Sequence, residues 1–127
     1  MKIQLKFVYG ICPALIFYVH TLQYDGETRG MVVRVRTSKP YIRDVIGHEL
    51  IHVRQFYRLP VIHSILYYFW APYRLQCEVE AYREQLSYYA DAGPYVYNSK
   101  IIAFAKLLSK NYRLNITRDE AERLIGG

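Results

Sequence analysis

The chain has 127 residues, a net charge of +6 and a hydrophobic fraction of 52%. These values indicate one folded domain, residues 1–127, and exclude a disordered chain. The basic residues are scattered and form no long run, so no specific nucleic-acid partner is expected. Cys12 and Cys77 have no C-x-x-C spacing and fit a reducing compartment, so we expect a cytoplasmic protein, although one bridge between them stays open.

Two apolar segments bear on the relation to membranes. The first follows Lys2 and Lys6 and runs from residue 7 to residue 19, but Pro13 interrupts it, so a signal peptide is not favoured. The second, residues 62–70, is far shorter than the roughly 20 residues that a membrane span needs. We therefore expect no transmembrane span, while contact with a membrane surface stays open.

The first elements predicted along the chain are strands. Residues 14–24 are β-branched and aromatic, and the turn dipeptide Asp25–Gly26 follows them. Residues 28–37 then read as a second strand, in which Val33 and Val35 alternate with arginines, as in a strand with one solvated face. The pattern predicts a β-hairpin.

A long helix is predicted next. Residues 38–40, Ser-Lys-Pro, are typical of a helix start, and Pro60 should end the helix near Leu59. One apolar stripe is the expected core face: Ile42, Ile46, Leu50, Val53 and Tyr57. His48 and His52 lie on the opposite side, so both sides of this helix should face something other than bulk water.

The most informative motif is the H-E-x-x-H sequence at residues 48–52 of this helix. Histidines four residues apart lie on one helical face, so both imidazoles can reach a single metal ion. The adjacent Glu49 could take a proton from a metal-bound water. The alternative is an ordinary helix that carries two histidines and no metal.

The remainder of the chain reads as helical. We expect a turn or short apolar helix over residues 61–71, a long helix from Pro72 to about Gly93, and a third helix capped by Asn98 or Ser99. A capping box at residues 117–120 predicts a short last helix. The chain is therefore predicted to be α+β, with a small N-terminal sheet packed on the histidine helix and on the next long helix, followed by one or two C-terminal helices.

Catalytic zinc normally takes three protein ligands, so a third ligand is expected. The sequence offers several: His20, His63, Glu78, Glu80, Glu84 and Asp91. Glu78 shares the apolar face of its helix, where burial of a carboxylate is costly unless a cation meets it, whereas Glu80 and Glu84 fall on the opposite side. Glu78 is the predicted ligand, with Glu80 or His63 as alternatives, and an ion pair with Arg74 is the interpretation without a metal.

Together these motifs resemble a known family. His48-Glu49-x-x-His52, followed on a later helix by Glu78-x-x-Ala81, resembles the gluzincin branch of the zincin metallopeptidases, and is similar to the minigluzincins and to CAAX-processing membrane peptidases over roughly residues 30–92. The resemblance implies a zinc-dependent peptidase in which His48, His52 and Glu78 bind Zn²⁺ and Glu49 is the general base. It also implies that an edge strand, here residues 31–37, aligns the peptide substrate as an added strand.

One position departs from the family pattern. The family usually has an aspartate four residues after the glutamate ligand, where this chain has Tyr82. Asp44, one turn before His48, is expected to orient a histidine instead, and His63, Tyr82 and Tyr89 are candidates to polarise a substrate carbonyl. The departure, with the small size and basic charge, keeps a second interpretation open: a non-catalytic metal-binding accessory or scaffold protein with a zincin-like fold, encoded by a phage or mobile element.

Overall fold

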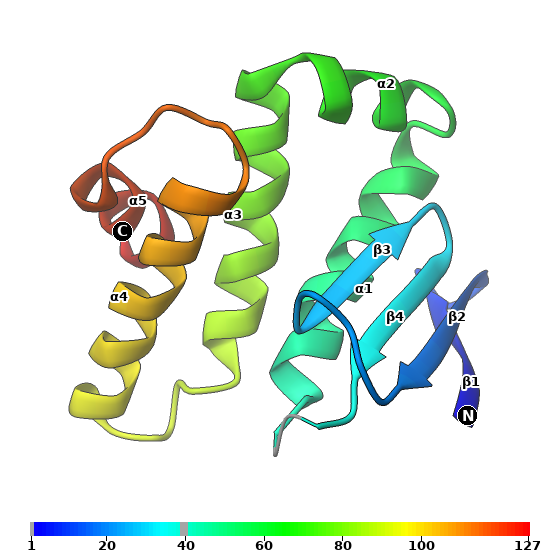
Figure 1. Cartoon of the computed structure of the whole chain (residues 1–127), viewed down its shortest axis with the longest axis horizontal. Coiled ribbons are helices and arrows are strands. Elements are labelled where there is room, and N and C mark those ends of the chain that lie inside the picture. Colours follow the sequence, from blue (N-terminus) through cyan, green and yellow to red (C-terminus); the bar gives the residue numbers. More distant parts are fainter. Residues whose placement is uncertain (1, 39–40) are drawn as a thin grey trace. The chain divides into compact units, whose positions relative to one another are not determined.

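The structure, a computed structural model, describes residues 2–38 and 41–127 and divides the chain into two compact units. Residues 1–64 form unit 1, which contains a four-stranded sheet and one long helix, and residues 65–127 form unit 2, which is helical (Figure 1). The predicted α+β class is confirmed. The single zincin-like domain predicted for residues 1–127 stays a prediction.

The sheet of unit 1 consists of two antiparallel hairpins joined by a parallel pair. β1 (Lys2–Val8) pairs with β2 (Cys12–Val19), and β3 (Gly26–Arg29) pairs with β4 (Val32–Arg36). β2 and β4 run in parallel, so the strand order is β1-β2-β4-β3. β4 is therefore an inner strand, and the prediction that residues 31–37 form an edge strand is wrong. β3 is the edge strand on that side of the sheet.

The predicted hairpin of residues 14–24 with residues 28–37 is also wrong, because β2 and β4 run in parallel and β4 forms its hairpin with β3. Gly26 opens β3, and the chain reverses at residues 30–31, where Gly30 has a φ of 59° that glycine adopts without steric cost. β1 is not among the predicted strands. Tyr9 and Gly10, both at positive φ, turn the chain after β1 and divide the apolar segment at residues 7–19.

The core of unit 1 lies between the sheet and helix α1 (Arg43–Arg58). The buried apolar side chains come from both elements: Val8, Ala14, Ile16, Val33, Val35, Val45 and Val53. The predicted core stripe of the helix is confirmed, since Val53 is buried and the other four residues pack against this cluster. The helix begins later than predicted, at Arg43 with Ile42 as its N-cap, and Lys39 and Pro40 lie outside the described residues.

Helix α2 (Ile62–Phe69) leads from unit 1 into unit 2, whose other helices are α3 (Ala71–Ser87), α4 (Pro94–Asn111) and α5 (Arg118–Gly126). One buried cluster holds unit 2 together: Tyr82, Leu86, Phe104, Ala105, Leu108, Leu114, Ala121 and Ile125. Of the predicted capping box, the N-cap at Thr117 is confirmed, because the Glu120 N–H donates to the Thr117 hydroxyl. No helix among the described residues is long and apolar enough to cross a bilayer.

Two boundaries in unit 2 differ from the prediction. α3 ends at Ser87, before the predicted stop near residue 93. α4 begins at Pro94 instead of at Asn98 or Ser99, because Gly93 takes a φ of 94° and proline fits the first turn, where its missing N–H costs nothing.

Candidate metal centre

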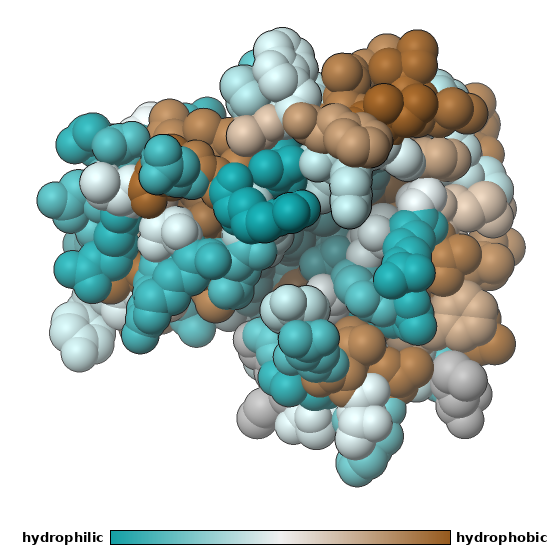
Figure 2. Space-filling view, turned by 45° about the horizontal axis from the view of Figure 1, so that its top comes forward, coloured by the Kyte–Doolittle hydropathy of each residue, from teal (hydrophilic) through white to brown (hydrophobic). Residues whose placement is uncertain are grey.

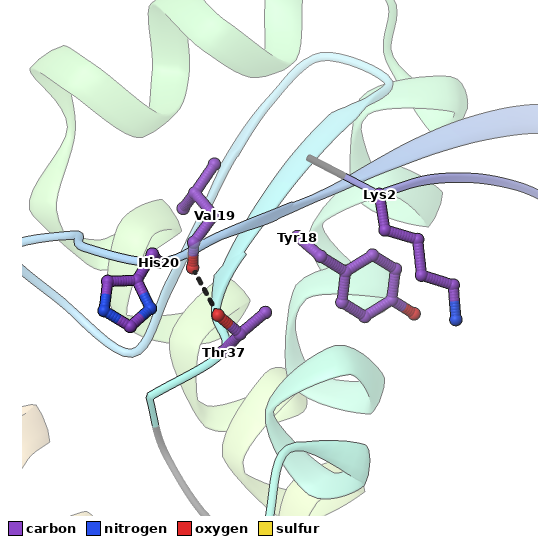
Figure 3. A pocket seen from close by; sticks show the side chains of 5 residues that line it. All are labelled: Lys2, Tyr18, Val19, His20 and Thr37. Carbon is purple, nitrogen blue, oxygen red and sulfur yellow. Dashed lines mark hydrogen bonds between the residues drawn. The ribbon is translucent and has the colours of Figure 1, made fainter.

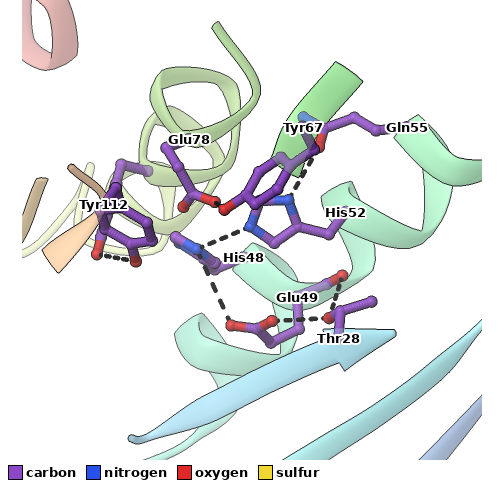
Figure 4. A network of polar contacts seen from close by, with 9 residues as sticks. Thr28, His48, Glu49, His52, Gln55, Tyr67, Glu78 and Tyr112 are labelled. Carbon is purple, nitrogen blue, oxygen red and sulfur yellow. Dashed lines mark hydrogen bonds and ion pairs between the residues drawn. The ribbon is translucent and has the colours of Figure 1, made fainter. Parts of the chain in front are cut away.

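The two motif histidines face each other on one side of α1. His48 and His52 are 5% and 9% exposed, their ring centroids are 5.0 Å apart, and their Nε2 atoms are 3.3 Å apart (Figure 4). Two neutral imidazoles cannot bring the lone pairs of both Nε2 atoms to this distance without repulsion. A proton on one of the two Nε2 atoms, or a cation bound by both, removes this repulsion. The helical spacing predicts such a metal-binding pair.

A glutamine fixes which nitrogen of His52 is available. Gln55, one turn further along α1, has its side-chain oxygen 2.9 Å from His52 Nδ1. This oxygen can only accept, so Nδ1 carries the proton and donates it to Gln55, which leaves the Nε2 lone pair for a metal. The sequence places Gln55 on the histidine side of the helix but does not give it this role. Asp44, the predicted orienting group, is buried on the same helix, and its role stays a prediction.

Glu49 is held beside the pair by the edge strand. Its carboxylate accepts a hydrogen bond from the Thr28 hydroxyl at 2.7 Å, and its Oε2 lies 3.9 Å from His48 Nε2 (Figure 4). The strand can approach this closely because residue 26 is glycine: a Cβ there would lie 2.9 Å from Val45 Cγ1 and 3.0 Å from Glu49 Cγ. Gly26 therefore allows β3 to lie close to α1. Thr28, which contacts Glu49, is not among the site residues predicted from the sequence.

In unit 2, Glu78 is the most deeply buried acid, 1% exposed on α3. The Tyr67 hydroxyl on α2 donates a short hydrogen bond to Glu78 Oε2 (Figure 4). The predicted inward position of Glu78 is therefore confirmed. The predicted alternative, an ion pair with Arg74, is wrong, because the Arg74 guanidinium donates to main-chain carbonyls: those of Tyr67, Tyr68, Tyr112 and Arg113.

Further tyrosines surround this carboxylate. Burial raises the pKa of Tyr112 well above its usual range, and the negative charge of Glu78 raises that pKa further. The hydroxyls of Tyr112 and Tyr82 are hydrogen-bonded at 2.9 Å, and Tyr82 also packs on Phe104 in the core of unit 2. Tyr82 occupies the position where the family has an aspartate, so the site is more apolar there than the family pattern implies.

Three buried residues could serve as metal ligands: His48 and His52 of unit 1 and Glu78 of unit 2. The other sequence candidates have different surroundings. Glu80 and Glu84 are half-buried and Asp91 is exposed. His20 lines a separate pocket of about 520 Å³ at the ends of β1, β2 and β4, together with Lys2, Tyr18, Val19 and Thr37 (Figure 3).

The candidates for polarising a carbonyl stay predictions. Tyr89 packs against Phe104 and under the Lys100 ammonium, and His63 is buried on α2. Tyr67, which the sequence did not single out, instead donates its hydroxyl hydrogen bond to Glu78.

No protein-family model matches the chain, and searches of curated proteins and of solved structures find no match either. The likeness to gluzincins therefore rests on the motif residues and their surroundings.

Proposed function

We propose that the protein is a zinc-dependent peptidase in which His48, His52 and Glu78 bind the metal and Glu49 acts as general base. The observation that carries the proposal is the pair of facing Nε2 atoms beside a carboxylate that Thr28 holds in place. A buried helix that merely tolerated two histidines would have no need of this third, oriented group.

The donor set favours zinc among the common divalent ions. Two imidazole nitrogens and one carboxylate oxygen form the ligand type of many catalytic zinc sites, which leave a fourth position open. The Gln55 contact supports this choice, since metal-bound histidines usually donate their other ring N–H to an oxygen. In this proposal Glu78 is the third ligand, and Tyr67 holds it through Oε2.

A zinc ion bound by these residues would supply Lewis-acid activation and lower the pKa of a coordinated water toward 7. The chain's own part is proton transfer: Glu49 takes a proton from the attacking water and passes it to the leaving amine of the cleaved peptide bond. Thr28 fixes the Glu49 side chain by its 2.7 Å hydrogen bond, so less of its rotational freedom must be lost in the reaction.

The substrate proposed for this site is an extended peptide bound along β3. Because the Asp25 carbonyl accepts from the Arg36 N–H, antiparallel alternation directs the main-chain groups of Gly26 and Thr28 away from β4. A peptide added there as a further strand would run beside the residue whose hydroxyl holds Glu49. The role first predicted for residues 31–37 thus passes to β3.

The experiment compares Glu49→Gln with the wild-type protein and with Glu84→Gln, a matched change on the half-buried part of α3. Each protein is assayed for bound zinc and for cleavage of an unbiased peptide library. Glu49→Gln should retain zinc and reduce cleavage by about a thousandfold, the usual scale of general-base catalysis, while Glu84→Gln behaves as wild type.

Two results would contradict the proposal. Undiminished cleavage by Glu49→Gln would remove the general-base role. Zinc bound by the wild-type protein without cleavage of any peptide would instead support a non-catalytic metal-binding accessory or scaffold protein.

A further inference from the structure

Helix α2 exposes an unusually apolar surface. Six of its side chains and neighbours are largely solvent-exposed, from 54% for Ile62, Ile65 and Trp70 to 78% for Phe69, and we call them the α2 surface: Val61, Ile62, Ile65, Tyr68, Phe69 and Trp70. Figure 2 shows hydrophobic side chains gathered over the part of the molecule where Figure 1 places α2. A group of exposed apolar side chains commonly marks an interaction site, whereas single exposed apolar residues are ordinary.

The backbone at the start of this surface is strained. Val61 has a φ of 68°, a conformation that costs a β-branched residue free energy, and its side chain is 70% exposed. The fold therefore keeps a strained residue just before α2, and the apolar side chain of that residue is exposed to water. This supports a function for the exposed face beyond the fold itself.

The charged residues nearest to the α2 surface in the sequence are all positive. No Asp or Glu occurs between Glu49 and Glu78, and both of these acids are buried. Two exposed arginines, Arg54 and Arg58, precede the surface on α1. A third, exposed Arg113, places its guanidinium 5.9 Å from the ring centre of Tyr68.

We propose that the α2 surface docks onto the headgroup region of an anionic lipid bilayer. The chemistry matches this occupant: aliphatic and aromatic side chains enter the boundary between headgroups and acyl chains, tryptophan and tyrosine favour that depth, and the arginines meet lipid phosphates. The helix has eight residues, so it lies in the interface and does not cross it. This proposal is independent of the peptidase activity.

The single tryptophan of the chain, Trp70, provides a direct probe. The full-length protein is mixed with phosphatidylcholine vesicles containing or lacking phosphatidylglycerol, and its emission and co-sedimentation are measured. Trp70 emission should shift to the blue only with the anionic vesicles, and high salt should reverse the shift. A shift that depends on protein concentration without vesicles would overturn the proposal in favour of a second copy of the chain.

Paired variants locate the surface. Ile65→Ser with Phe69→Ser should weaken binding to anionic vesicles by about tenfold or more, from the apolar area no longer inserted. Tyr95→Ser with Ile102→Ser, which changes two exposed apolar residues on α4, should leave binding unchanged. Circular dichroism checks that each variant is folded.

A rival surface is tested in the same way. Leu5 and Phe7 are exposed on β1 beside Lys6. If Leu5→Ser with Phe7→Ser abolishes binding while the α2 double variant binds normally, or if Trp70 emission never responds to anionic vesicles, the assignment to α2 is wrong.

Discussion

The two units hold their proposed metal ligands by different means. In unit 1, His48 and His52 are placed by the periodicity of one helix, and the residue that orients His52 lies only three positions further on. In unit 2, Glu78 is held by Tyr67, which belongs to a different helix. The histidine pair is thus a local feature of the sequence, whereas the glutamate depends on how helices pack.

Arg74 connects the segments of unit 2 that carry Tyr67 and Tyr112. Its buried guanidinium donates to the carbonyls of Tyr67 and Tyr68 at the end of α2, and to those of Tyr112 and Arg113 after α4. One cation thereby joins two chain segments that carry the tyrosines near Glu78. Hydrogen bonds to a charged donor are stronger than neutral ones, which suits a residue that fixes two segments at once.

The largest expected effect tests unit 1. His52→Ala should lower the affinity for zinc by about a thousandfold, because one of three ligands and the orienting Gln55 contact are lost together. The affinity is measured by competition with a chelator of known strength. His20→Ala, which removes a histidine from the separate pocket of unit 1, is the control and should bind zinc as wild type does. Equal affinities for the His52 variant and the control would contradict the proposed site.

The next effect tests whether unit 2 contributes to the same ion. Glu78→Ala should reduce zinc affinity by about a hundredfold or more, since a charged ligand is removed while both imidazoles remain. Glu84→Ala, on the same helix, is the matched control. If the Glu78 variant binds zinc as tightly as the control, the metal belongs to the histidine pair alone and the three-ligand centre is wrong.

Features set by helical periodicity can be predicted from the sequence, whereas contacts between different elements cannot. The H-E-x-x-H helix, its core stripe and the burial of Glu78 follow from helical periodicity, and the structure confirms them. Thr28 and Tyr67 could not be predicted in this way, because each lies on a different element from the carboxylate that it contacts. The strand order could not be predicted for the same reason, since it depends on which elements pair.

Gly26 illustrates this dependence on how elements pack. Beside Asp25 it reads as a turn glycine, but its missing side chain allows β3 to approach α1. Whether a glycine serves a turn or a close approach depends on which elements pack together, and this information is not local. The inner position of β4 cannot be predicted for the same reason, since parallel pairing with β2 leaves no signal in either strand alone.

A smaller effect tests the support of Glu78. Tyr67→Phe removes only the hydroxyl that donates to Glu78, so zinc affinity should fall by about tenfold, as for other groups that orient a metal ligand. Tyr68→Phe, the exposed neighbour, should leave the affinity unchanged. Thermal unfolding without metal distinguishes a positioning role from a structural one. A loss of metal-free stability with no loss of zinc affinity would show that Tyr67 serves only the fold of unit 2.

The smallest effect tests the support of Glu49 in unit 1. Thr28→Val removes the hydroxyl hydrogen bond and keeps the β-branched shape that suits β3. One hydrogen bond contributes about 1 kcal/mol, so the catalytic rate should fall by about threefold to tenfold, while zinc affinity stays at the wild-type value because no ligand is touched. Thr37→Val, which loses a hydroxyl contact with the Val19 carbonyl, is the control. A loss of zinc affinity in Thr28→Val would mean that β3 supports the histidines and not the general base, and the edge strand would then belong to the metal centre itself.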